Sequence, residues 1–245
     1  MIKEALEYIL GQAENKTYEI GGMTWSDHKL VPVQFNELIP YPGNLRVGSL
    51  DAIITLIKHE ACEILPSIKA EPPLFIRIDS PTRVTVLTRL NKNNERCTIY
   101  TAEQDDVNFQ EGWREPQKAI IELRSRFIPN DDSAYLISLL SKIKNGKDLE
   151  VKDNGVSQSV TVQQGISLVG EEQIKPRVKL CPFRTFREVA QPESEFIFRV
   201  DDNGYVGLFE ADGGVWKMEA KDYIRAYLAG NLVSETVNGL VVVMV

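Results

Sequence analysis

Apolar side chains recur every three or four positions in four stretches of the chain, which is the spacing of amphipathic helices. The second stretch begins at Ser49, a candidate N-cap, and the third follows acidic residues that favour the positive end of a helix. Gly146 and Gly230 mark the ends of the last two, since glycine is favoured just after a helix. The pattern predicts helices over residues 2–14, 49–66, 131–146 and 221–229.

Alternating apolar and polar residues, bounded by turn residues, predict the strands. They are expected at residues 74–79, 83–90, 96–102, 119–127, 149–152, 157–163, 177–182, 195–200, 205–210, 215–218 and 240–245. Gly21-Gly22 and the nearby prolines indicate an irregular or extended segment, and residues 103–117 are polar and loop-like. Hairpin turns are expected at Asn154-Gly155, Asn203-Gly204 and Gly213-Gly214, because these dipeptides tolerate positive φ.

Runs of antiparallel strands with few helices indicate an α+β fold, mainly antiparallel sheet with three or four helices. A helix followed by about three strands occurs twice, at residues 49–102 and 131–182, which is the pattern of an internal repeat although few residues are identical. We expect an N-terminal helix and extended segment (1–45), a first α+β unit (46–128) and a second α+β unit (129–245). The two units are expected to pack together as one domain.

The chain has 245 residues, of which 43% are hydrophobic and 26% charged, enough for a substantial core. Its net charge of −7 argues against a generally basic nucleic-acid binder but is compatible with a local basic strip. Cys62, Cys97 and Cys181 are odd in number and far apart, which favours a reducing compartment. The N-terminus does not resemble a signal peptide, and the longest apolar run, 240–245, is too short to cross a bilayer. We expect a soluble intracellular protein.

Familiar catalytic and cofactor motifs are missing from the sequence. The phosphate-binding patterns GxGxxG and GxxxxGK[ST] do not occur, nor does the GxSxG pattern of serine hydrolases. His28 and His59 have no partner at zinc-ligand spacing. Cys181 lies in a strand-like run, where a buried, unreactive thiol is expected. We therefore expect no catalytic residue, no metal and no cofactor.

The distribution of charge singles out the region after residue 175. Residues 175–189 hold five basic side chains and one acidic, whereas residues 193–222 hold eight acidic and three basic. A basic strip beside an acidic hairpin could bind an anionic partner, because arginine offers a forked set of donors. The candidate binding residues are Arg177, Arg184, Arg187, Glu193, Glu210, Asp212 and Trp216.

Two other interpretations of these residues stay open. The charges could pair within the protein across adjacent strands and otherwise form an ordinary solvated surface. The carboxylates of residues 193–219 could instead form an acid–base pair or bind Mg²⁺, although strand alternation argues against most combinations. Trp113 and Trp216 could stack on a base or pack against the core, and Trp216 is expected to be half-buried.

Three segments of the chain resemble the YfdQ-like family of uncharacterised phage and prophage proteins. They are DNGVSQSVTVQQG at 153–165, CPFRTFREVAQPESEFIFRV at 181–200 and LFEADGGVWKMEA at 208–220. The similarity would span about residues 45–235. It implies a phage or prophage origin and action in the host cytoplasm, and it carries over no functional residue and no activity.

These observations favour an accessory protein without catalysis that binds a host or phage macromolecule in DNA metabolism or defence evasion. The partner would be a host or phage protein or a nucleic-acid-processing complex. One alternative is a metal-dependent enzyme acting on nucleotides or nucleic acid. Another is a self-assembling ring or structural protein, in which the closing segment LVVVMV adds to the sheet edge of a second copy. A buried central strand is the simpler interpretation of that segment.

Overall fold

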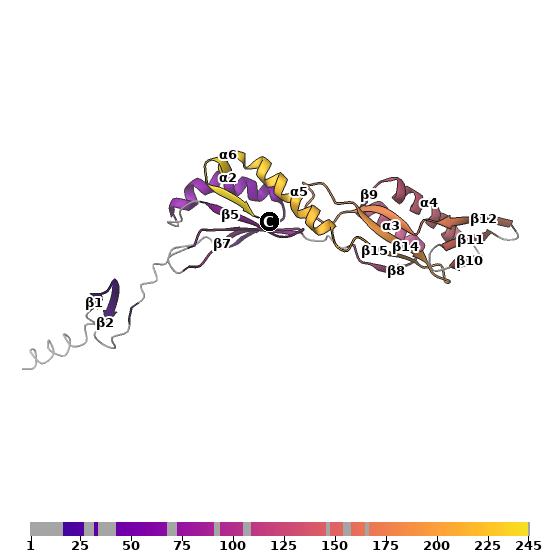
Figure 1. Ribbon diagram of the computed structural model, residues 1–245, viewed down its shortest axis with the longest axis horizontal. Coiled ribbons are helices and arrows are strands. Elements are labelled where there is room, and N and C mark those ends of the chain that lie inside the picture. The colour runs from indigo at the N-terminus through magenta and orange to yellow at the C-terminus, as the bar shows by residue number, and fades with distance from the viewer. Residues whose placement is uncertain are drawn as a thin grey trace, which may run out of the picture. The chain divides into compact units, whose positions relative to one another are not determined.

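The structure is a computed structural model, and its elements follow the chain in the order shown in Figure 1. It describes residues 17–26, 32–33, 43–67, 73–90, 94–104, 109–145, 148–153, 158–164 and 167–244. The chain divides into two compact units, Met1–Pro40 and Tyr41–Val245.

The first unit holds a small antiparallel sheet of strands β1 (Thr17–Ile20), β2 (Met23–Ser26) and β3 (Pro32–Val33). Gly21 and Gly22 join β1 to β2 with φ of 64° and 79°, so the paired glycines form a hairpin turn rather than the irregular segment expected. The helix predicted at 2–14 lies outside the described residues.

The second unit contains two hydrophobic cores, and the first is built on a five-stranded sheet. Its order is β16-β5-β6-β7-β4, with β16 and β4 parallel to their neighbours and the other pairs antiparallel. The strands are β4 (Leu45–Val47), β5 (Leu74–Ser80), β6 (Arg83–Leu87), β7 (Thr98–Glu103) and β16 (Val241–Met244). Figure 1 shows the helices α2 (Leu50–Ser67), α5 (Trp216–Asn231) and α6 (Val233–Val237) together on one side of this sheet.

Helix α2 forms where its apolar pattern predicts it. Leu50, Ile53 and Ile57 are almost fully buried in the first core, as expected for side chains at helical spacing. The hydroxyl oxygen of Ser49 accepts a hydrogen bond from the backbone N–H of Ala52 at 3.2 Å, which confirms the predicted N-cap.

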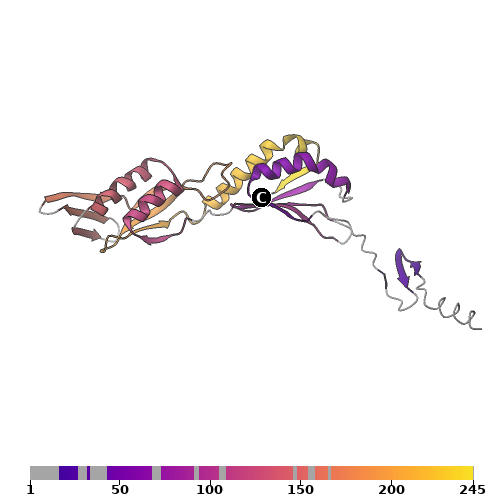
Figure 2. The ribbon, with the colours of Figure 1, turned by 180° about the vertical axis from the view of Figure 1, so that it is seen from behind.

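The second core is built on a sheet in the order β8-β15-β14-β13-β9. Its strands are β8 (Gly112–Arg114), β9 (Phe127–Ile128), β13 (Arg177–Pro182), β14 (Ser194–Val200) and β15 (Val206–Glu210). Helices α3 (Pro116–Arg126) and α4 (Asp131–Asn145) pack their buried side chains against one face of this sheet. Figure 2 shows the same arrangement from behind, with both helices on a single side.

A separate three-stranded antiparallel sheet follows α4, formed by β10 (Asp148–Asp153), β11 (Gln158–Gln164) and β12 (Ser167–Ile174). The buried side chain of Gln158 connects it to β14, because its amide nitrogen donates to the carbonyl of Val200 at 2.7 Å and its oxygen accepts from the Val200 N–H at 3.0 Å. The hairpin predicted between β10 and β11 is confirmed by their pairing, while Asn154-Gly155 itself lies outside the described residues.

The α+β fold class is confirmed, since most strand pairs are antiparallel and the helices lie outside the sheets. The first expected run of a helix and three antiparallel strands is present as α2-β5-β6-β7. The second run is α4-β10-β11-β12, but its third strand was not predicted, because the strand expected there, 177–182, is β13 of the second five-stranded sheet. Only the first run belongs to a five-stranded sheet. The cores also cross the expected boundary after residue 128, because the first core includes Ile224 and Leu228, and the second includes Ala119 and Leu123.

Two predicted strands are wrong. Residues 119–126 lie in helix α3 and Phe127 begins β9, because Pro116 occupies a first-turn position and Ala119 and Leu123 are buried one helical turn apart. The loop expected at 103–117 contains strand β8 as well as the start of that helix. Residues 215–218 belong to the start of α5, so Gly213-Gly214 leads from a strand into a helix and makes no hairpin.

The closing segment forms strand β16, but its position differs from the simpler interpretation. Among the described strands it lies at the edge of the first sheet, parallel to β5, and is not central. Val241 is buried while Val242 is partly exposed, so only alternate side chains of this apolar run face the core.

Candidate functional site

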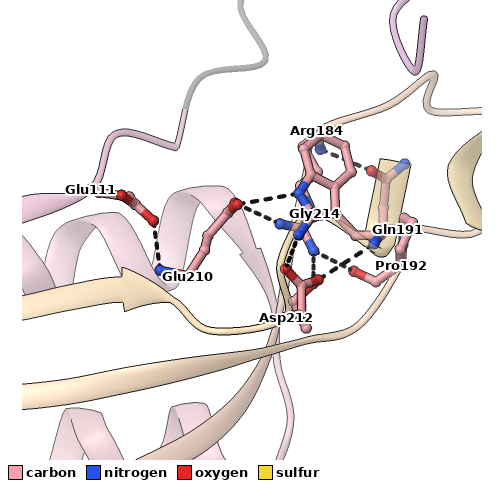
Figure 3. Close-up of polar contacts among 9 residues, drawn as sticks. Glu111, Arg184, Gln191, Pro192, Glu210, Asp212 and Gly214 are labelled. Atoms are coloured by element: carbon pink, nitrogen blue, oxygen red, sulfur yellow. Dashed lines mark hydrogen bonds and ion pairs between the residues drawn. The ribbon is translucent and has the colours of Figure 1, made fainter. Parts of the chain in front are cut away.

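Four of the seven candidate residues, Arg184, Glu210, Asp212 and Trp216, meet in one network with Ser194, which we call the Arg184 cluster (Figure 3). Arg184 lies in the loop between β13 and β14, Ser194 begins β14, and Glu210 ends β15. Asp212 follows β15, and Trp216 begins α5. The cluster therefore forms where two strands of the second core meet the helix that enters the first.

The Arg184 side chain is only 3% exposed and is held from several sides. Its Nη1 donates to Oε1 of Glu210 at 2.8 Å, and its Nη2 donates to the Ser194 hydroxyl and to the carbonyl of Pro192. The guanidinium carbon lies 4.0 Å from the centre of the Trp216 ring, which is a close cation–π distance. Arg184 is thus an interior side chain with its charge balanced locally.

Asp212 organises the turn into α5. Its Oδ2 accepts from the Ser194 hydroxyl at 2.6 Å and from the backbone N–H of Trp216 at 3.4 Å. Its Oδ1 accepts from the backbone N–H of Gly214 at 2.9 Å. Gly213 and Gly214 both have positive φ, so the paired glycines allow the backbone to fold around this carboxylate.

The electrostatics of the cluster follow from burial and pairing. Burial lowers the pKa of Arg184, and the nearby Glu210 and Asp212 oppose this without cancelling it. Burial also tends to raise the pKa of Asp212, but hydrogen bonds from Ser194, Gly214 and Trp216 and the charge of Arg184 give a net lowering. The lowered pKa of Asp212 favours its carboxylate form, which is the form that accepts these hydrogen bonds.

The carboxylate oxygens of the cluster are committed to protein partners. Glu210 accepts from Arg184 through Oε1 and from the Trp216 indole nitrogen through Oε2, at 3.2 Å. Within the described residues, no group of three or more His, Cys, Asp or Glu side chains is arranged to hold a metal ion. Glu210 and Asp212 therefore hold together the end of β15, the start of β14 and the start of α5.

The loop that carries Arg184 also contacts the first core. Phe186 and Val189 are buried among the side chains of that core. The Thr185 hydroxyl donates to the carbonyl of Pro81 at 2.5 Å, and Oε1 of Glu188 accepts from the backbone N–H of Leu50 at 2.7 Å. Together with α5, this loop links the two cores.

The other three candidate residues lie outside the cluster and are exposed. Arg177 pairs with Glu195 at 2.6 Å, and Glu193 pairs with Lys179 at 3.9 Å. The Arg187 guanidinium lies 5.1 Å from the ring centre of Phe183. These contacts match the interpretation of pairing across adjacent strands, which contributes little to stability when the groups are solvated.

A second feature is the face of the second sheet turned away from α3 and α4, which we call the aromatic face. Strand alternation places on it Trp113, Arg177, Lys179, Glu195, Ile197, Arg199 and Phe209. All seven are exposed or half-buried, whereas their strand neighbours Val178, Phe196 and Leu208 are buried against the helices. Trp113 is 51% exposed.

Gly207 determines how the two aromatic rings lie on this face. It pairs with Trp113 on one side and Arg199 on the other. A Cβ atom at position 207 would lie 2.5 Å from Cε2 of Phe209 and 3.2 Å from Cε3 of Trp113. The rings therefore converge over the glycine, with centres 5.7 Å apart and planes at 73°.

The sequence contained a signal for the aromatic face that our predictions did not use. In β14, the outward positions Glu195, Ile197 and Arg199 alternate with buried residues, and Ile197 is an apolar residue where a solvated face would carry a polar one. Phe209 is the matching outward residue of β15. The contribution of Trp113 required tertiary structure, because β8 pairs with β15 across more than ninety residues.

No protein-family model, curated protein or solved structure matches this chain. None of the helices in the described part of the chain is both long and apolar enough to span a bilayer. The resemblance to the YfdQ-like family thus stays a prediction from sequence motifs.

Proposed function

We propose that the chain is a phage or prophage accessory protein that binds a host or phage macromolecule in the host cytoplasm. The observation that supports this most is the aromatic face, where the exposed ring of Trp113 and the half-buried ring of Phe209 lie beside arginine and lysine side chains. Clustered aromatic and arginine side chains are enriched at sites of macromolecular recognition. DNA metabolism and defence evasion are the processes in which such binding would act.

Binding by the aromatic face requires no rearrangement of the protein interior. Trp113, Lys179 and Arg177 are accessible as they stand. Arg184 and Trp216, by contrast, would have to leave Glu210 before they could bind anything else. We therefore propose that the Arg184 cluster stabilises the fold and that the aromatic face binds the partner.

Self-assembly is a second candidate, favoured by the position of β16 at a sheet edge among the described strands. An edge strand can pair with a second copy unless a charge or a twist prevents it. If β16 mediates assembly, Val242→Lys would turn an oligomer into a monomer in sedimentation velocity. An unchanged sedimentation coefficient would remove this candidate. The metal-dependent enzyme gains no support, since the Glu210 and Asp212 oxygens are already engaged.

The proposed function is tested by crosslinking in the host cell. A photoreactive phenylalanine analogue at position 179, on the aromatic face, should yield one defined product whose partner is identified by mass spectrometry or sequencing. The same analogue at position 223, an exposed tyrosine site on α5, serves as the matched control. Identical products from both positions, or none from position 179, would contradict binding through this face.

A further inference from the structure

We infer that the aromatic face binds single-stranded nucleic acid, with bases stacked on Trp113 and Phe209 and phosphates held by the adjacent basic side chains. This inference rests on the proposed function and names its partner. Sheet faces with exposed aromatic rings are a recurrent platform for unpaired bases, because every base has a flat surface that can stack.

The arrangement of the rings is the first argument. Gly207 lets Phe209 and Trp113 lie low over the strands, and the edge-to-face contact between them holds both in place. Half of the Trp113 side chain is still exposed to solvent in this packed position. A rigid, partly exposed ring loses little conformational freedom when a base stacks on it, so the platform is formed before the ligand arrives.

The charge of the face is the second argument. Among the strand residues of this face, Arg177, Lys179 and Arg199 outnumber the single carboxylate, Glu195, although Glu111 and Glu193 lie at its margins and the chain as a whole carries a net charge of −7. The Arg177 and Lys179 side chains are 61% and 71% exposed. Ion pairs of such exposure are weak, so a phosphate can replace the carboxylate partners of both cations.

The third argument is an unmatched donor beside the rings. The Nη1 atom of Arg199 is buried and has no hydrogen-bond partner among the described residues. Strand pairing places Arg199 in the same row as Gly207 and Trp113. A buried donor without an acceptor is costly, and a phosphate or base carbonyl that enters between Arg199 and the rings would satisfy it.

The test is fluorescence anisotropy of the full chain with labelled oligo(dT) and oligo(U) of about 20 nucleotides, a length that spans a typical single-strand site. We expect measurable binding that weakens with salt. Trp113→Ala should weaken it about tenfold or more, the effect of one lost stacking contact, while Trp113→Phe should keep most of the affinity. Circular dichroism melting checks that both variants are folded.

Two charge variants and a duplex of the same length serve as further tests of the binding mode. Lys179→Glu should weaken binding, whereas Arg225→Glu, an equal charge change on exposed α5, should leave it nearly unchanged. Binding that is insensitive to Trp113→Ala, or equal binding of duplex of the same length, would overturn the stacking inference. No binding of any oligonucleotide would overturn it too. If crosslinking from position 179 then identifies a protein, the proposed function survives without this inference; if it identifies nothing, both fail.

Discussion

At the scale of single residues, the chain separates groups that stabilise the fold from groups available to a partner. The Arg184 guanidinium and the Asp212 carboxylate bind partners within the protein, although their charges made them candidates for binding. Trp113 is neither charged nor part of a motif, yet it is half exposed on a structured surface. For these residues, the contacts made in the folded protein indicate the role better than the residue type does.

Gly207→Ala tests whether the rings need the glycine. A methyl group there would overlap Phe209, so the rings must shift, and we expect a loss of about 1–3 kcal/mol in the free energy of unfolding. Urea denaturation measures this loss. Gly230→Ala is the control, because a Cβ at that helical position meets nothing within 4 Å and should be neutral or stabilising. Equal stability of both variants would contradict the ring packing described.

At the scale of elements, α5 matters most because it belongs to both parts of the second unit. Its first turn is held by Asp212, and its later side chains Ile224 and Leu228 pack in the first core. The Tyr227 hydroxyl donates to Oδ1 of Asp51 in α2 at 2.5 Å. This hydrogen bond adds a polar contact to the packing of α5 and α2 in the first core.

The contact between Tyr227 and Asp51 should make stability depend on alkaline pH. The hydrogen bond to Asp51, followed by burial and the charges of Asp51 and Glu188, raises the pKa of Tyr227 from 10.0 to about 12. Because the folded pKa is the higher one, the contribution is complete below pH 10 and is lost as the pH rises to about 12. Thermal melting of wild type against Tyr227→Phe over this window should show a difference that disappears at the upper end.

Tyr223→Phe, on the same helix but at a 40% exposed position, is the control for loss of a phenol. The melting temperature of this variant should change with pH as that of the wild type does. A difference between wild type and Tyr227→Phe that stays constant up to pH 12 would show that the hydrogen bond to Asp51 does not set this titration.

At the scale of the whole molecule, the second unit has two cores joined by α5 and by the loop that carries Arg184. Phe186 and Val189 of this loop are buried in the first core, while Arg184 binds the strand ends of the second sheet. The Arg184 cluster is therefore expected to couple the unfolding of the two cores.

Arg184→Ala tests this coupling. It would leave Glu210 and Asp212 without their cation, and we expect a loss of about 2–4 kcal/mol, below the fully buried case because Glu210 is partly exposed. Hydrogen exchange should show residues 216–220 losing protection before β14 does. Arg177→Ala, which removes an exposed pair, should cost less than about 1 kcal/mol. If Arg184→Ala lowered hydrogen-exchange protection equally in both cores, the Arg184 cluster would not act locally where the two cores meet.

Patterns carried by neighbouring residues were enough to predict the α+β class, the buried stripe of α2 and the hairpin between β14 and β15. In that hairpin Gly204 has a positive φ, and the Asp201 carboxylate accepts from the N–H groups of Asn203 and Tyr205. Interactions over a few residues decide such features, so the sequence alone determines them.

Where a local sequence pattern fits two structures, tertiary contacts decided which one forms. Residues 119–127 fit both a strand and a helix, and burial of Ala119 and Leu123 in the second core selects the helix. Gly213-Gly214 fits a hairpin, but the Asp212 carboxylate instead accepts from the backbone N–H groups of Gly214 and Trp216, where α5 begins. Glu210 meets Arg184, and Trp113 meets Phe209, through strand pairing between distant parts of the chain. Sequence spacing does not determine such partners, because they depend on the order and register of strands in the folded sheet.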